Sequence, residues 1–397
     1  MPTQRSILAT VVGLVGAALL LLSTPTAADA TRSASTSGEP ARGAGHWAAA
    51  GELLVTRDHP VAALLRDGRV LVAGGTADRA NSAEIYDPAT GSSTATPPTH
   101  VVRFEPSMTR LADGRVLLAG GFGLAHGQAV RATEIYDPAS GTWTVTAPMH
   151  QRRFGAAAAL LHNGRVLVVG GEVYGRNGSR ALRSAELYLP RADRWVVTSP
   201  TRWPHASSEG RQDTAVLRDG DVLVAGQMNG DTGISGRAER YAVGSGRWLP
   251  AGTLPLARTP ALIRLPSGQV LAVAGYTFGW SPYGRSPVDR YLPKRHRWVS
   301  DPALPSSFGY PGVVKVGGRP FAVGECPGRR PTRPCPAVAR YRPGSRSWTP
   351  AAPMPDSRQS FATVRLPDGT VLVIAGTYQP PMTEFTPISS VLRWSVS

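Results

Sequence analysis

A recurring arginine is the side chain in this sequence best suited to holding an anionic ligand. Six arginines lie nine to eleven residues before a turn glycine: Arg57, Arg103, Arg153, Arg211, Arg258 and Arg358. A guanidinium group can hold a carboxylate, sulfate or phosphate through paired hydrogen bonds. A ring of such groups therefore predicts an anionic ligand. The alternative is structural, because each arginine could instead bond the carbonyl groups of nearby loops.

Two residues that can exchange protons follow the first two of these arginines. His59 lies two residues after Arg57, and Glu105 lies two residues after Arg103. A histidine and a carboxylate beside one ligand could act as general acid and base. His205, in a longer segment before the fourth repeat, is a weaker candidate, because a lone histidine is more often structural.

Aromatic residues outside the regular repeat positions are a third set of candidates. They lie in segments expected to be loops or the start of a strand: Trp203, Tyr276, Trp280, Tyr283 and Tyr310. Such rings could stack on sugar faces or anchor a protein partner. The alternative is that long loops use an apolar residue to fix themselves to the surface.

Other sequence signals of chemistry are missing. The chain has no Gly-x-Ser-x-Gly, His-Glu-x-x-His or phosphate-loop motif. Its two cysteines, Cys326 and Cys335, flank one loop and predict a local disulfide in an oxidising compartment. Two such ligands without a nearby histidine make a poor zinc site. No metal and no cofactor is therefore expected.

An internal repeat of about 50 residues supplies the elements that would position the candidates. In each copy a turn glycine is followed six residues later by a Gly-Gly-like pair. The seven pairs begin at Gly74, Gly120, Gly170, Gly226, Ala274, Gly324 and Ala375. The apolar run between turn and pair is too short for a helix and predicts a buried strand. The Asp-Gly or Asn-Gly turns before it predict hairpins.

The second half of each repeat predicts two further strands, giving strands a, b, c and d in chain order. A tyrosine marks strand c in six copies, and a tryptophan seven residues later marks strand d in five. The first copy has Ser93 instead of tryptophan, and the last ends at Trp394 without a strand d. Trp47 precedes Arg57 by ten residues, as in later copies. The sequence therefore predicts an all-β, seven-bladed β-propeller whose N-terminal strand pairs with the C-terminal blade.

This combination of apolar strand, Gly-Gly pair, tyrosine and tryptophan resembles the kelch repeat over residues 46–397. The resemblance implies a fold like the central domain of galactose oxidase. It also implies that the b-to-c loops and the d-to-a links share one face, which often binds ligands. The pair departs from Gly-Gly at Gln227, Ala274, Glu325 and Ala375, which is expected to alter local turns and not the fold.

A binding module that recognises a glycan or protein on this face is the preferred interpretation of function. The alternative is a sugar-active enzyme, for which the resemblance offers two types. Copper radical oxidases need a cysteine cross-linked to tyrosine and two histidine ligands, and this chain lacks a Tyr-His dipeptide and any cysteine outside one loop. Sugar mutarotases need only Arg, Glu or His around the substrate, although that family has six blades. The sequence interpretation therefore leans away from an enzyme.

The N-terminal residues predict export. Arg5 precedes an apolar run, and a small-residue stretch ends at Ala30 in the form that signal peptidase prefers. Residues 1–30 are therefore predicted to be a signal peptide, residues 31–45 a flexible linker and residues 46–397 the propeller. An uncleaved membrane anchor is the alternative, because the apolar run is only slightly shorter than a membrane span.

The expected location is thus secreted or extracellular, with retention at the cell surface left open. The net charge of +16 favours anionic partners such as wall polymers or acidic glycans. Nucleic acid is not expected, because no nucleic-acid-binding module is recognisable. The protein is predicted to be a monomer without a membrane span after signal cleavage.

Overall fold

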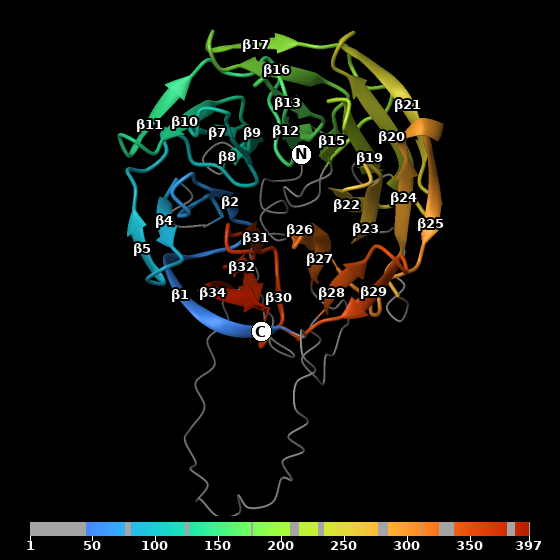
Figure 1. The fold of residues 1–397 in the computed structure, drawn as a ribbon. Coiled ribbons are helices and arrows are strands. Elements are labelled where there is room, and N and C mark those ends of the chain that lie inside the picture. The colour runs from blue at the N-terminus through green and yellow to red at the C-terminus, as the bar shows by residue number, and fades with distance from the viewer. Residues whose placement is uncertain are drawn as a thin grey trace, which may run out of the picture.

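The computed structural model describes residues 45–75, 81–123, 127–175, 178–206, 214–228, 234–276, 285–309, 311–324, 337–378 and 386–396. They form seven main antiparallel sheets arranged as blades of a ring, with strand a near the centre and strand d at the rim (Figure 1). The predicted all-β, seven-bladed propeller is confirmed. No helix in the described ranges is long and apolar enough to cross a membrane.

The first six blades each have four strands in the order a, b, c, d. Blade one consists of β2 (Val61–Leu64), β3 (Val70–Ala73), β4 (Ala83–Asp87) and β5 (Ser92–Ala95). Blade two consists of β6 (Ser107–Arg110), β7 (Val116–Ala119), β10 (Thr133–Asp137) and β11 (Thr142–Thr146). Blade three consists of β12 (Ala157–Leu160), β13 (Val166–Val169), β16 (Ala185–Leu189) and β17 (Arg194–Val197).

The remaining blades follow the same plan. Blade four consists of β18 (Thr214–Val216), β19 (Val222–Met228), β20 (Ile234–Ala242) and β21 (Arg247–Thr253). Blade five consists of β22 (Thr259–Arg264), β23 (Val270–Tyr276), β24 (Val288–Leu292) and β25 (Arg297–Asp301). Blade six consists of β26 (Gly312–Val316), β27 (Arg319–Gly324), β28 (Ala337–Arg342) and β29 (Ser347–Pro350). Blade seven consists of β31 (Ala362–Arg365), β32 (Val371–Ile374), β34 (Thr386–Ser395) and β1 (His46–Arg57).

A few short elements lie outside this plan. Small hairpins between strands b and c join β8 (Phe122–Gly123) to β9 (Gln128–Ala129) and β14 (Glu172–Gly175) to β15 (Gly178–Ala181). In blade seven, β30 (Arg358–Gln359) pairs with β33 (Thr377–Tyr378). A single 3-10 turn, η4 (Pro293–Arg295), is described between β24 and β25.

Strand b is buried on both sides because it lies inside its sheet and between neighbouring blades. Every residue of β3, β7, β13 and β32 is buried. This explains why the sequence of strand b is uniformly apolar instead of alternating, and its burial stabilises the ring. Farther out, the repeated tyrosine and tryptophan face each other across strands c and d, as in Tyr136 and Trp143 with ring centres 5.1 Å apart.

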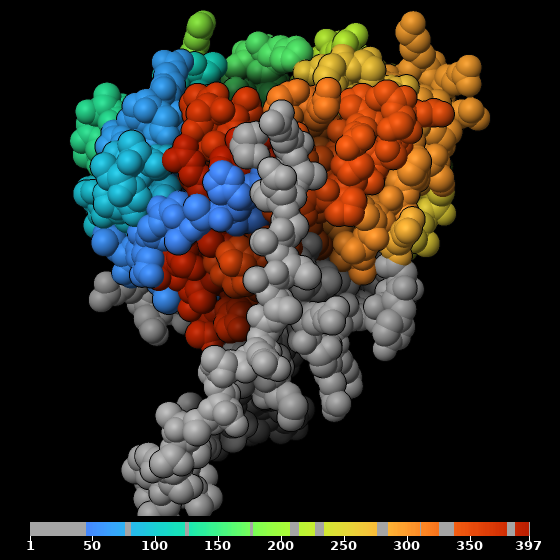
Figure 2. Space-filling model, turned by 60° about the horizontal axis from the view of Figure 1, so that its bottom comes forward, coloured from blue at the N-terminus to red at the C-terminus, as the bar shows by residue number. Residues whose placement is uncertain are grey.

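Strand β1 closes the ring as the sequence predicted. Trp47 lies opposite Trp394, as Trp143 lies opposite Tyr136 in blade two. The Trp47 indole N–H donates to Ala352 O at 2.7 Å, which ties it to blade six. Figure 2 shows the N-terminal strand crossing the C-terminal blade on the outside of the molecule.

Blade one is complete although it lacks the tryptophan of strand d. Tyr86 in β4 pairs with Ser93 in β5. Strand β1 continues from blade seven onto this blade, where the Tyr86 hydroxyl donates to Ala50 O. A Cβ added at Gly51 would lie 1.8 Å from Gly91 O, so the two backbones meet too closely for a side chain there.

The strand register defines two faces of the ring. In blade one, the first residue of strand a pairs with the last of strand b, which pairs with the first of strand c. The d-to-a links and b-to-c loops therefore share one face, called the loop face below. The a-to-b hairpin turns lie on the opposite, turn face.

Candidate functional site

The recurring arginines lie inside the blades and not at their surface. Arg57, Arg103, Arg153, Arg258 and Arg358 are 0–1% exposed. Four of them pair with a carboxylate of strand c in the same blade: Arg57 with Glu84, Arg103 with Glu134, Arg153 with Glu186 and Arg258 with Asp289. Arg358 pairs with Asp356, because strand c of blade seven has Leu392 at this position.

The same guanidinium groups also hold the backbone of the Gly-Gly-like turn. Arg57 donates to Gly74 O at 2.7 Å, and Arg153 donates to Gly170 O at 2.6 Å. Burial lowers the pKa of both arginines, although the facing carboxylates oppose this effect. These contacts favour the structural alternative for the arginines, because carboxylates and carbonyl groups already surround them.

Blade four uses a histidine where the others use arginine. The carbonyl of His205 accepts a hydrogen bond from Gly171 N, as Arg153 O does from Gly121 N. The ring of His205 is 3.0 Å from a Glu239 carboxylate oxygen and 2.8 Å from Gly226 O. The sequence pattern predicted Arg211 at this place, and Arg211 lies outside the described residues. Among the described residues, His205 makes these contacts of the repeat.

The carboxylate partners have a constant spacing in the sequence that was not among the predicted site features. Each lies two residues before the tyrosine of strand c: Glu84, Glu134, Glu186, Glu239 and Asp289. Blade six has Ala339 at this position and Phe308 near the arginine position, so both members of the pair are replaced together. In blade six the loss of the arginine thus accompanies the loss of the carboxylate, whereas blade seven keeps Arg358 and supplies Asp356 as its partner.

Trp203 joins the blade-four network at the loop face. Its backbone N–H donates to Glu239 at 3.1 Å, and the guanidinium carbons of Arg237 and Arg202 lie 4.6 and 5.1 Å from its ring centre. Two cations this close to the indole favour one orientation of the ring. Trp203 is therefore at least partly structural.

The structure does not describe the side chains of the other aromatic candidates. Trp280, Tyr283 and Tyr310 lie outside the described residues, as do Cys326 and Cys335 of the predicted disulfide. Tyr276 ends β23, and only its backbone is described.

His59 and Glu105 occupy equivalent left-handed turns on the loop face. Their φ angles are 54° and 49°, and the corresponding Gly155 and Ser360 have 56° and 53°. Non-glycine residues rarely adopt this conformation, and such residues concentrate at functional sites. The Glu105 carbonyl accepts a hydrogen bond from Gly155 N at 3.1 Å, which connects the turns of blades two and three.

Aromatic rings join these turns into one cluster. The His59 ring lies 5.0 Å from that of Phe104, the residue before Glu105. Phe104 forms an antiparallel bridge with Phe122 of β8. Phe104 and Phe122 were not among the ligand-binding rings predicted from the sequence, although Phe104 directly follows a repeat arginine.

The cluster continues across blade three. Phe154 and Tyr174 are stacked, with ring centres 5.3 Å apart and an angle of 8°, and Phe122 lies 5.2 Å from Tyr174. Tyr174 is 52% exposed, so one side of this aromatic wall faces solvent. Glu172 is buried beside it and accepts a hydrogen bond from Ser179. The loop face of blades one to three thus combines His59 and Glu105 with an aromatic wall.

Two substitutions at Glu105 test whether its backbone is strained. Alanine in a left-handed turn costs roughly 1–2 kcal/mol, whereas glycine adopts this conformation freely but loses more chain entropy on folding. We therefore expect Glu105→Gly to be more stable than Glu105→Ala by about 1 kcal/mol in denaturant unfolding. The same two substitutions at Glu52, in strand β1, should show the opposite order. Greater stability of Glu105→Ala would contradict the strain.

The described residues contain no group of three or more His, Cys, Asp or Glu side chains that could hold a metal ion. The donor set in these ranges therefore does not fit a copper centre.

Comparison with known proteins identifies the fold. No protein-family model and no curated protein matches the chain. The structure is similar to that of a fungal alcohol oxidase of the AA5 family, described as having catalytic diversity and solved with copper. The TM-score is 0.68 at 18% sequence identity, and the match covers 89% of this chain and 76% of the oxidase. The likeness shows a galactose oxidase-like propeller.

This match corrects the functional interpretation drawn from the sequence. A binding module was preferred there over an enzyme, yet one solved structure that shares the fold is that of an enzyme. The preference for a module without catalysis is therefore corrected, and the likeness itself, at 18% sequence identity, shows the fold alone.

Proposed function

We propose that this protein is an exported, kelch-type propeller enzyme that interconverts the anomers of a sugar by acid–base catalysis at His59 and Glu105. One observation carries the proposal: these two ionisable residues occupy equivalent strained turns next to an aromatic wall. The repeat of Gly-Gly, tyrosine and tryptophan supports the kelch type, and the N-terminal sequence supports export. The fold alone does not decide the function, because propellers host many functions.

The two residues have complementary roles in this reaction. The Glu105 carboxylate removes the proton of the anomeric hydroxyl, and the released electron pair forms the carbonyl at C1. The bond between C1 and the ring oxygen breaks, and the ring oxygen takes a proton from the His59 imidazolium. Reclosure on the other face of the carbonyl returns both protons. General acid–base catalysis of this kind contributes roughly 10²- to 10⁴-fold in rate.

The surrounding residues would position the reacting groups. Asp58 Oδ1 lies 2.6 Å from His59 Nδ1, so a carboxylate lies directly beside the proposed acid. Tyr174 and Phe122 offer ring faces and edges to the apolar face of a sugar.

Anomer interconversion measured by polarimetry and by NMR exchange on a panel of aldoses tests the proposal. We expect the wild-type protein to accelerate at least one aldose, and His59→Gln or Glu105→Gln to lower kcat/KM by about 10²-fold or more. His162→Gln and Glu52→Gln, at exposed positions outside the cluster, should retain activity. No acceleration of any aldose, or full activity of both site variants, would contradict the proposal.

A further inference from the structure

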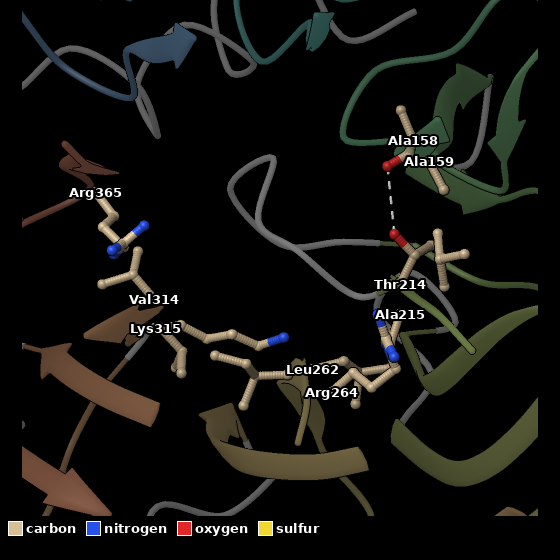
Figure 3. Close-up of a pocket in the computed structure, with 12 residues that line it drawn as sticks. Ala158, Ala159, Thr214, Ala215, Leu262, Arg264, Val314, Lys315 and Arg365 are labelled. Atoms are coloured by element: carbon tan, nitrogen blue, oxygen red, sulfur yellow. Dashed lines mark hydrogen bonds between the residues drawn. The ribbon is translucent and has the colours of Figure 1, made fainter. Parts of the chain in front are cut away.

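The centre of the ring contains a cavity that the proposed reaction does not use. It has a volume of about 430 Å³ and is lined by strands a of blades three to seven. Figure 3 shows cationic and apolar side chains around the same opening. Pockets of this size can hold a small molecule.

Three cationic side chains line one part of this cavity. Arg264, Lys315 and Arg365 lie at the end of β22, β26 and β31, and each directly precedes a buried apolar residue, Leu265, Val316 or Leu366. They therefore occupy the same repeat position in three successive blades. In blade two this position holds Arg110, whose guanidinium donates to Leu64 O at 2.8 Å and is thus already engaged.

The rest of the cavity wall is mostly apolar. Ala158, Val216 and Leu262 line it, and the Thr214 hydroxyl is bonded to Ala158 O at 3.3 Å. At the position of the three cations, blades one, three and four have Leu64, Leu160 and Val216. The channel thus has a cationic side and an apolar side.

No ion pair joins the three cations to a carboxylate of the described residues. The carboxylates of the nearby a-to-b turns are paired elsewhere: Asp67 with Arg69, Asp113 with Arg115, Asp221 with Arg240 and Asp368 with Arg393. Burial lowers the pKa of Lys315, and the charge of Arg264 lowers it further. An anion among these groups would offset their mutual repulsion.

We propose that the central channel binds a small organic anion, with its charged head at Arg264, Lys315 and Arg365 and its apolar body against Ala158, Val216 and Leu262. This site differs from the catalytic cluster, which lies at the opposite end of strand a. Four residues of extended chain separate the cationic end of strand a from the end at the catalytic cluster by roughly 13 Å.

Binding of three probes measures the contribution of each side of the channel. Phenyl phosphate carries an anionic head and an apolar ring, inorganic phosphate only the head, and benzyl alcohol only the ring. Calorimetric titration of the full chain should give saturable binding of phenyl phosphate, at least tenfold weaker binding of inorganic phosphate, and no binding of benzyl alcohol. Equal affinity for the two phosphates, or no saturable binding of phenyl phosphate, would overturn the proposal.

The two lysines of the chain provide a matched pair of reporters. Lys315 lines the channel, whereas Lys294 lies exposed in η4. Lys315→Met should weaken phenyl phosphate binding at least tenfold, and Lys294→Met should leave it unchanged. In the unsubstituted protein, NMR of ¹³C-labelled lysine should show phenyl phosphate shifting the Lys315 signal and raising its pKa. Equal shifts of both lysines, or none, would overturn the proposal without depending on how a variant folds.

Discussion

Deletion of residues 46–56 should lower the melting temperature by roughly 10 °C or more, whereas deletion of residues 31–45 should leave it nearly unchanged. The reason is closure of the propeller ring, because β1 supplies strand d of blade seven and pairs with β34. Leu53 is buried and Trp47 packs against the core of blades six and seven. Loss of both side chains and of the edge pairing should lower the free energy of unfolding by about 5 kcal/mol. Each kcal/mol corresponds to about 2 °C in the melting temperature of a chain of this size.

Thermal unfolding followed by circular dichroism measures this difference. A third variant, Trp47→Ala, keeps the strand but removes its main contact with blade six, including the bond to Ala352 O. It should fall between the two deletions. Equal melting temperatures of the two deletion variants would refute the pairing of the N-terminal strand.

Replacement of Arg153 by leucine should lower the free energy of unfolding by about 3–5 kcal/mol. The substitution leaves the Glu186 carboxylate buried without its cation, and it removes a donor from Gly170 O. Burial alone would raise the pKa of Glu186, but the His150 backbone N–H and Arg153 outweigh it and lower that pKa. Removing Arg153 should therefore move the pKa upward.

A double substitution distinguishes the loss of the ion pair from the cost of leaving one charge buried without a partner. Arg153→Leu combined with Glu186→Leu removes both charges, as Phe308 and Ala339 do in blade six. The double variant should be more stable than Arg153→Leu alone in denaturant unfolding. Arg69→Leu, which breaks an exposed pair with Asp67, should cost under about 1 kcal/mol. A double variant as unstable as the sum of its single substitutions would contradict this explanation.

The stability of this pair also depends on pH. The folded-state pKa of Glu186 is lowered, so its contribution to stability is present above the unfolded-state pKa and is lost as the pH falls through the folded value. The Arg153–Glu186 pair therefore belongs to the contacts that acid weakens.

The candidate site was only partly predictable. His59 and Glu105 were found from their spacing to the arginines, and the structure places them in equivalent turns. The phenylalanines beside them were missed, because Phe104 and Phe122 meet only through a bridge between a link and a b-to-c loop. The arginine ring was given a ligand-binding role because its partners, such as Glu186, lie about 30 residues away in sequence.

The sequence by itself determined the blades. The hairpin turn, the buried strand and the cross-strand pair of tyrosine and tryptophan are local features, because each lies within a single repeat of the chain. Trp47 even identified the closing strand, because it keeps the spacing of the repeat. Only the tertiary structure decided which cationic side chains have a carboxylate partner. Arg153 is enclosed by its own blade, whereas Arg264, Lys315 and Arg365 come together from three blades, because ring closure turns one repeat position into one wall of a channel.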